Sequence, residues 1–354
     1  MVKIRIYVRR RVRTSLKVKI VSASLSTLAA VVAIVLMFHV LGVDPLYAFN
    51  RIYMASLGSY YGISETITKS IPLLLCGVGL AVAYKAKVWN IGAEGQLLMG
   101  AIVSGGLALF TPLPPQLAIP IIFLGGFIGG ALWALIPAVL KAKFQVNEVI
   151  TTLMMNYIAE RILLYLVYGP WRGKEVWGFP FTSRIPSYAR LPVVPGTRIH
   201  YPTLIIGLVS AVLLFFMLSR TTIGFKVRVI GESIRASNYA GIEYSKIVIL
   251  VMIISGGLAG LAGAGEVAGI QHMLRKGISP GYGFTAIIVA WLGNLNPLLV
   301  IASSLLIASI LVGGDAIQIS IGLSSAFINL FNGTILIFLL LNYFLSEYEI
   351  IVRR

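Results

Sequence analysis

The sequence has few of the residue types on which metal centres and catalytic sites depend. It contains one cysteine, three histidines and 12 acidic residues among 354, and only 12% of its residues are charged. The single Cys76 excludes a disulfide within the chain, and no two histidines have a His-x-x-x-His spacing. A Gly-x-x-x-x-Gly-Lys-Ser/Thr motif for nucleotide phosphates is also lacking. The sequence therefore predicts no metal, no cofactor and no catalytic centre.

Apolar residues dominate instead. They make up 58% of the chain, and the mean hydropathy is +0.92. Runs of about 20 apolar residues are long enough to cross a bilayer, and the chain has room for about eight to ten of them. We therefore predict an all-α fold, a polytopic transmembrane helical bundle of 8–10 spans with broken helices, in the plasma membrane.

The basic residues predict how the chain is oriented. In a soluble protein the net charge of +17 would suggest nucleic acid, but here basic blocks alternate with apolar runs. Such blocks favour the cytoplasmic side and lipid headgroups, so the expected partner is the bilayer and not nucleic acid. Residues 1–20 form a basic cytoplasmic tail, 21–346 a transmembrane domain and 347–354 a second cytoplasmic tail. A cleaved signal peptide does not fit, because the first apolar run, about 21–43, is too long and lacks a small-x-small site.

Two long polar segments separate apolar runs. Residues 170–201 hold Trp171, Trp177 and five prolines, and are expected outside the membrane as a docking surface for another protein. Residues 220–246 are rich in lysine and arginine and are expected in the cytoplasm. Within this insert, Glu232 to Tyr239 lacks proline and glycine and stands between Gly231 and Gly241. This pattern predicts one short helix with a glycine at each end.

Two shorter breaks point to a transport pathway. The first is Asn90-Ile-Gly-Ala-Glu-Gly-Gln96 and the second is Leu292-Gly-Asn-Leu-Asn-Pro297. An unpaired polar group in hydrocarbon costs several kcal/mol, so paired breaks in the two halves of a transporter usually line a cavity. A cytoplasmic turn after Lys85 and Lys87 is the alternative for the first break. Residues 284–313 either re-enter the membrane, giving eight spans, or cross it twice, giving ten.

These breaks supply the candidate site residues. We expect the solute pathway to be lined by polar side chains at Asn90, Glu94, Gln96, Asn147, Asn294 and Asn296. Amides suit a neutral solute with many donors and acceptors. A carboxylate at membrane depth is costly, so Glu94 is also expected to have a structural role. In that role it accepts hydrogen bonds from backbone N–H groups of the opposing break.

Small residues predict close helix packing. Residues 117–140 hold two overlapping Gly-x-x-x-Gly pairs, Gly125/Gly129 and Gly126/Gly130, and residues 247–269 are rich in glycine. Glycine allows two membrane helices to approach backbone to backbone.

Taken in order, several motifs resemble one family. They are Asn90-Ile-Gly-Ala-Glu-Gly-Gln96, Asn147-Glu-Val-Ile-Thr-Thr-Leu-Met-Met-Asn-Tyr157, Arg228-Val-Ile-Gly-Glu232, Tyr239-Ala-Gly-Ile242, Ser255-Gly-Gly-Leu-Ala-Gly-Leu-Ala-Gly263 and Ser279-Pro-Gly-Tyr-Gly-Phe284. From about residue 66 to 340 the chain resembles permease subunits of ABC importers of the simple-sugar and nucleoside group. The form Asn-Ile-Gly-x-Glu-Gly-Gln is similar to the nucleoside branch.

The resemblance implies a division of labour among subunits. A separate ATPase would dock on the cytoplasmic insert, an extracellular solute-binding lipoprotein would deliver the solute, and a second permease, identical or related, would complete the channel. The chain itself would not be an enzyme. The residues implied in ATPase coupling are Gly231, Glu232, Ala236, Tyr239, Ala240 and Gly241. Two alternatives stay open: a sugar or branched-chain amino-acid ABC permease of the same fold, and an ion-coupled secondary transporter using carboxylates such as Glu94, Glu148, Glu160, Glu266 and Asp315.

Overall fold

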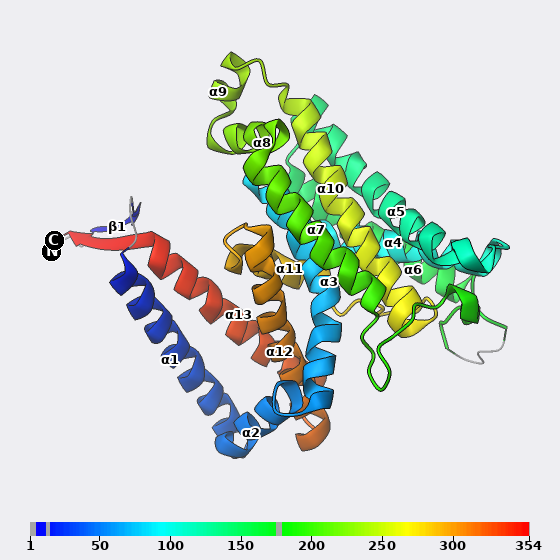
Figure 1. Ribbon diagram of the computed structural model, residues 1–354. Coiled ribbons are helices and arrows are strands. Elements are labelled where there is room, and N and C mark those ends of the chain that lie inside the picture. The colour runs from blue at the N-terminus through cyan, green and yellow to red at the C-terminus, as the bar shows by residue number, and fades with distance from the viewer. Residues whose placement is uncertain (1–4, 12–14, 175–178, 354) are drawn as a thin grey trace. The chain divides into compact units, whose positions relative to one another are not determined.

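The computed structural model describes residues 5–11, 15–174 and 179–353, and its ribbon is shown in Figure 1. Trp177 of the predicted outer loop lies outside the described residues. The predicted helical membrane bundle is confirmed. Eight described helices are long and apolar enough to cross a membrane by length and composition. The chain forms two compact units, residues 1–63 with 309–354 and residues 64–308. The bounds of the transmembrane domain, 21–346, stay a prediction.

The first unit brings the two ends of the chain together. Its elements are β1 (Arg5–Arg10), α1 (Leu16–Val40), α2 (Pro45–Ser56), the end of α12 (Pro297–Ile321), α13 (Ser325–Glu347) and β2 (Tyr348–Arg353). The strands β1 and β2 pair antiparallel, with Arg5 opposite Arg353 and Arg10 opposite Tyr348 (Figure 1). The sequence did not predict this pairing. It places both tails on one side of the unit, and the cytoplasmic location of that side stays a prediction.

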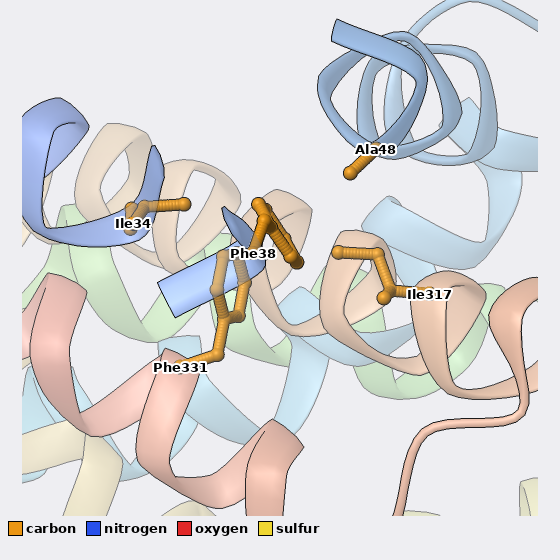
Figure 2. Packing of buried hydrophobic residues seen from close by; sticks show 5 residues of the cluster. All are labelled: Ile34, Phe38, Ala48, Ile317 and Phe331. Carbon is orange, nitrogen blue, oxygen red and sulfur yellow. The ribbon is translucent and has the colours of Figure 1, made fainter. Parts of the chain in front are cut away.

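A hydrophobic cluster holds the helices of the first unit together. Figure 2 shows Ile34 and Phe38 of α1, Ala48 of α2, Ile317 of α12 and Phe331 of α13 gathered in one buried group. The rings of Phe38 and Phe331 lie 6.0 Å apart between centroids, a distance at which aromatic pairs attract. This contact joins the first and last long helices of the chain.

The second unit contains the predicted close-packed helices. It is built from most of α3 (Tyr60–Lys85), α4 (Ala93–Phe110), α5 (Pro115–Phe144), α6 (Glu148–Tyr168), the 3-10 helix η1 (Ser187–Ala189), α7 (Tyr201–Arg220), α8 (Thr222–Glu232), α9 (Ile234–Tyr239), α10 (Tyr244–Gly265), the π-helix η2 (Glu266–Gln271), α11 (Tyr282–Leu292) and the start of α12. A Cβ at Gly130 would clash with the carbonyl of Gly256, and one at Gly260 with the carbonyl of Gly126. The glycines of α5 and α10 therefore permit the backbone contact that their spacing predicted.

Both predicted breaks exist. The first separates α3 from α4, and the second separates α11 from α12. At the second break Asn294 and Leu295 have φ values of 51° and 53°, a left-handed conformation that ends α11. α12, with 25 residues, is long enough to span by itself, whereas α11, with 11, is not. The segment 284–313 is thus neither one re-entrant piece nor two full spans.

The insert after α7 differs from the prediction. The sequence predicted one helix over Glu232–Tyr239, but α8 runs through Gly231 to Glu232, and α9 begins only at Ile234. The reason is Ser233, which has an extended backbone and accepts a hydrogen bond from Ala236 N at 3.3 Å, as a helix N-cap does. Gly241, with φ +66°, follows α9 as predicted.

The segment expected outside the membrane packs onto the end of η2 and the loop that follows it. Backbone hydrogen bonds join Leu191 N to Ala268 O and Ile185 N to His272 O, at 2.9 Å each. His200 at its end is buried, and this burial lowers the pKa of His200 to about 4, so the ring is neutral at pH 7. The docking role of this segment stays a prediction.

Candidate translocation site

A polar stripe on α6 holds the first break in place. Glu148, Thr152 and Asn156 are spaced four residues apart and therefore lie on one face of the helix. Thr152 Oγ1 accepts a hydrogen bond from Ile91 N at 3.1 Å. Asn156 contacts the break twice: its Nδ2 donates to Ile91 O, and its Oδ1 accepts from Gly95 N, at 2.8 Å each. The exposed backbone of the break thus finds partners on α6.

Glu148 extends this stripe to a third helix. Its Oε2 lies 2.8 Å from Nζ of Lys141, near the end of α5, and its Oε1 accepts a hydrogen bond from Trp89 N at 3.4 Å. Glu148 is buried, so the pair is shielded from solvent. This contact ties α5, α6 and the break together.

Asn90 and Gln96 form a buried pair of amides inside the break. Asn90 Nδ2 donates to Gln96 Oε1 and to Ser255 Oγ, and Gln96 Nε2 donates back to Asn90 Oδ1, all at 3.0 Å. Asn90 Oδ1 also accepts from Gly92 N, and the Asn90 carbonyl accepts from the Tyr84 hydroxyl. Asn90 is 0% exposed. These contacts make the pair a framework of the break.

Glu94 links the first break to the start of α11. Its Oε2 accepts a hydrogen bond from Gly283 N at 2.8 Å, and Ser279 and Gly281 face the same carboxylate. A Cβ at Gly283 would clash with the backbone of Glu94, so the starts of α4 and α11 are in direct contact. Backbone donors were predicted for Glu94, but from the break at 292–297. The observed donor belongs instead to the first turn of α11.

A cavity of about 220 Å³ opens beside Glu94. It lies between α4, α6 and the segment that leads into α11. Its lining combines carboxylates, an amide, a hydroxyl and two partly exposed aromatic rings: Glu94, Leu98, Asn156, Tyr157, Glu160, Leu163, Gly277, Ile278, Ser279, Gly281 and Phe284. Such a lining can hydrogen-bond a neutral polar solute and stack on the face of its ring.

The remaining predicted pathway residues lie elsewhere. Asn147 Oδ1 accepts from Val149 N at 2.9 Å and caps α6, and Asn296 Oδ1 accepts from Leu298 N at 3.0 Å in the first turn of α12. Asn296 borders a separate cavity of about 180 Å³, together with Lys85 and Arg228. Asn294 is exposed at the second break. The Glu94 cavity therefore does not include Asn147, Asn294 or Asn296 in its lining.

Asn156, Glu160, Ser279 and Phe284 line the cavity but were not among the predicted site residues. One signal was present in the sequence: polar residues at 148, 152, 156 and 160 repeat every four positions, which marks one face of a helix. The residues at 279 and 284 had no such signal, because their place beside α4 depends on a contact between distant parts of the chain.

Comparison with known proteins identifies relatives across most of the chain. A family model described as "Branched-chain amino acid transport system / permease component" matches residues 62–341. The chain is 33% identical to a glucose ABC transporter permease protein of Haloferax volcanii, over 88% of this chain and 84% of that protein. It is 31% identical to a guanosine ABC transporter permease protein of Bacillus subtilis, over 87% and 89%. A nucleoside ABC transporter permease protein of Lactococcus lactis is 31% identical over 77% of each chain. No solved structure matches.

Proposed function

We propose that the chain, which belongs to the family of ABC transporter permease components described for branched-chain amino acid transport systems, imports nucleosides. As such a permease it is a multi-pass protein of the plasma membrane and a transport component rather than an enzyme. Membership in this family leaves no role for the ion-coupled mechanism considered above. In this proposal ATP hydrolysis belongs to a separate ATPase subunit, and an extracellular lipoprotein delivers the solute.

The Glu94 cavity carries the proposal. Glu94, Asn156 and Ser279 offer hydrogen bonds, while Tyr157 and Phe284 offer ring faces. A nucleoside needs both, since its sugar has hydroxyl groups and its base has a flat face. The relatives named for guanosine and nucleosides favour the same solute class.

The size of the cavity favours a second permease subunit. At about 220 Å³ it is smaller than the roughly 300–1,000 Å³ of typical ligand sites. Tyr157 and Phe284 are 54% and 39% exposed and stand at its rim. We infer that a second permease, identical or related, faces this rim and completes the pathway.

Glucose is the second candidate solute, because the relative from Haloferax volcanii carries that name. Uptake by the complete transporter, expressed with its ATPase and binding protein, distinguishes the two. We expect uptake of labelled guanosine that requires ATP, is competed by other nucleosides and is not reduced by excess glucose. Uptake of glucose without any uptake of nucleosides would overturn the proposal.

The short helix α9 is proposed to dock on the ATPase. It exposes Ile234, Ala236 and Tyr239, and Tyr239 is 94% exposed. The preceding helix α8 packs against the transmembrane helix α3, because buried Gly231 of α8 lies against the carbonyl of Lys85 at the end of α3. Glu232 ends α8, and Ala240 and Gly241 follow the end of α9. The predicted coupling residues therefore lie on α9 or next to its two ends.

Replacing Tyr239 with alanine tests this docking. Since the side chain is almost fully exposed, its loss should not affect folding, whereas an aromatic ring at the centre of an interface typically contributes more than about 1 kcal/mol. We expect uptake to fall roughly 5-fold or more, with the amount of permease in the membrane unchanged. Tyr60→Ala, which removes another exposed tyrosine at the start of α3, is the matched control. Equal uptake by wild type and Tyr239→Ala would argue against docking through α9.

A further inference from the structure

One side of α11 continues from the Glu94 cavity to a pair of tryptophans. Phe284, Ile288 and Trp291 are spaced at i, i+4 and i+7, so they lie on one face of the helix. All three are at least partly accessible, while Ala286, Val289 and Ala290 of the same helix are buried. Phe284 lines the cavity at the start of α11, and Trp291 lies one residue before its end. Phe284 and Trp291 are seven residues apart, and a helix rises about 1.5 Å per residue, so the face leads about 10 Å from the cavity along the helix axis.

At the far end of this face Trp291 stacks on Trp89. Their ring centroids are 5.8 Å apart and the planes differ by 22°. The ring of Tyr84 contacts both tryptophans, with centroids 5.6 Å from Trp89 and 6.0 Å from Trp291. Tyr84 is 4% exposed and fixed by its hydrogen bond to the Asn90 carbonyl, whereas Trp89 is 44% exposed. The two tryptophans thus form a supported, partly exposed aromatic surface.

This surface lies toward the insert that is proposed to bind the ATPase. Trp89 follows Lys85 and Lys87 in the chain, and Lys85 contacts Gly231 of α8. Lys87 borders a cavity of about 360 Å³ together with residues 230–235 of α8 and α9. The Glu94 cavity and the tryptophan pair therefore mark the two ends of α11, with the pair closer to the insert.

We propose that Trp89 and Trp291 form a second contact site for the solute, on which the nucleobase stacks after it leaves the Glu94 cavity. The proposal rests on the proposed nucleoside function. Stacking tolerates any base, because every base has a π-face, and it requires no charge. A nucleoside passing along α11 would then exchange the ring of Phe284 for the tryptophan pair, and a narrow choice of base would not be needed.

Uptake by the complete transporter tests the pair. Trp89→Leu and Trp291→Leu should each lower nucleoside uptake about 10-fold, more for purine than for pyrimidine nucleosides, because purines have the larger stacking surface. Trp89→Phe and Trp291→Phe should restore most of the rate. Phe216→Leu, which changes an exposed aromatic residue on α7, is the control. Each rate is divided by the amount of permease in the membrane.

Fluorescence gives a second measurement that does not depend on transport. The chain has five tryptophans. Replacing Trp133, Trp171 and Trp177 with phenylalanine leaves Trp89 and Trp291 as the only sources of tryptophan emission. Guanosine added to this full-length permease in lipid nanodiscs should quench the emission, and glucose should not.

The possible results separate the two proposals. If the wild type carries nucleosides but both leucine variants keep its rates and its preference, with no quenching by guanosine, the second site is wrong and the nucleoside function stands. If the wild type carries only sugars, the proposed nucleoside function is wrong, and the proposal that a nucleobase stacks on the tryptophan pair is wrong with it. Lower uptake with rescue by phenylalanine, together with quenching, supports the second site.

Discussion

Replacing Glu94 with alanine should reduce nucleoside uptake by about 100-fold. The buried carboxylate accepts a hydrogen bond from Gly283 N, and alanine would leave that N–H without a partner inside the fold. An unpaired buried donor costs roughly 1–3 kcal/mol, which corresponds to about 5- to 150-fold in a rate or equilibrium. The same change removes one of the polar groups that line the cavity. The loss of this group and the unpaired N–H should both lower uptake.

Glutamine at position 94 separates charge from hydrogen bonding. Glu94→Gln keeps an oxygen that can accept from Gly283 N, so we expect uptake within about 5-fold of wild type. Initial uptake rates, divided by the amount of permease in the membrane, are the measurement. Glu243→Ala is the matched control, because Glu243 is an exposed carboxylate paired with Lys246. Wild-type uptake by Glu94→Ala would contradict a role in the site, and equal loss in both variants would mean that the negative charge is required.

The fold was predictable where it follows from local pattern. Apolar runs of membrane length, glycine spacing in residues 117–140 and the two polar breaks each depend on neighbours within one or two helical turns. The contacts of Asn90 with Gln96 and Gly92 are equally local. The pathway role predicted for these amides stays a prediction, and the sequence does not reveal that their polar groups already have partners in the fold.

The site was predictable only in part because its closing contacts are long-range. Glu94 and Gly283 are separated by 189 positions, and Asn90 and Ser255 by 165. Nothing in the residues near Glu94 specifies that its donor lies in the first turn of α11 rather than in the break after that helix. The pairing of β1 with β2 joins the two ends of the chain and was missed for the same reason.

Replacing Asn90 with leucine should destabilise the fold and leave the preference among solutes unchanged. Asn90 is fully buried, and leucine, of similar size, would remove the partners of Gln96 and of Gly92 N. Each unpaired group costs roughly 1–3 kcal/mol, so the total is several kcal/mol. For a unit of this size 1 kcal/mol shifts the Tm by about 2–4 °C, and we expect a fall of about 10 °C or more.

Asn296→Ala provides the comparison from the second break. Asn296 is only partly buried and makes a cap contact to Leu298 N, so its loss should cost about 1 kcal/mol and a few degrees. The Tm of each purified permease in lipid nanodiscs and the uptake of several nucleosides are measured side by side. If Asn90 instead lined the pathway, Asn90→Leu would keep the wild-type Tm and change the ranking of nucleosides. That result would overturn the framework role, because a fully paired amide cannot be removed from the buried interior of the fold without a loss of stability.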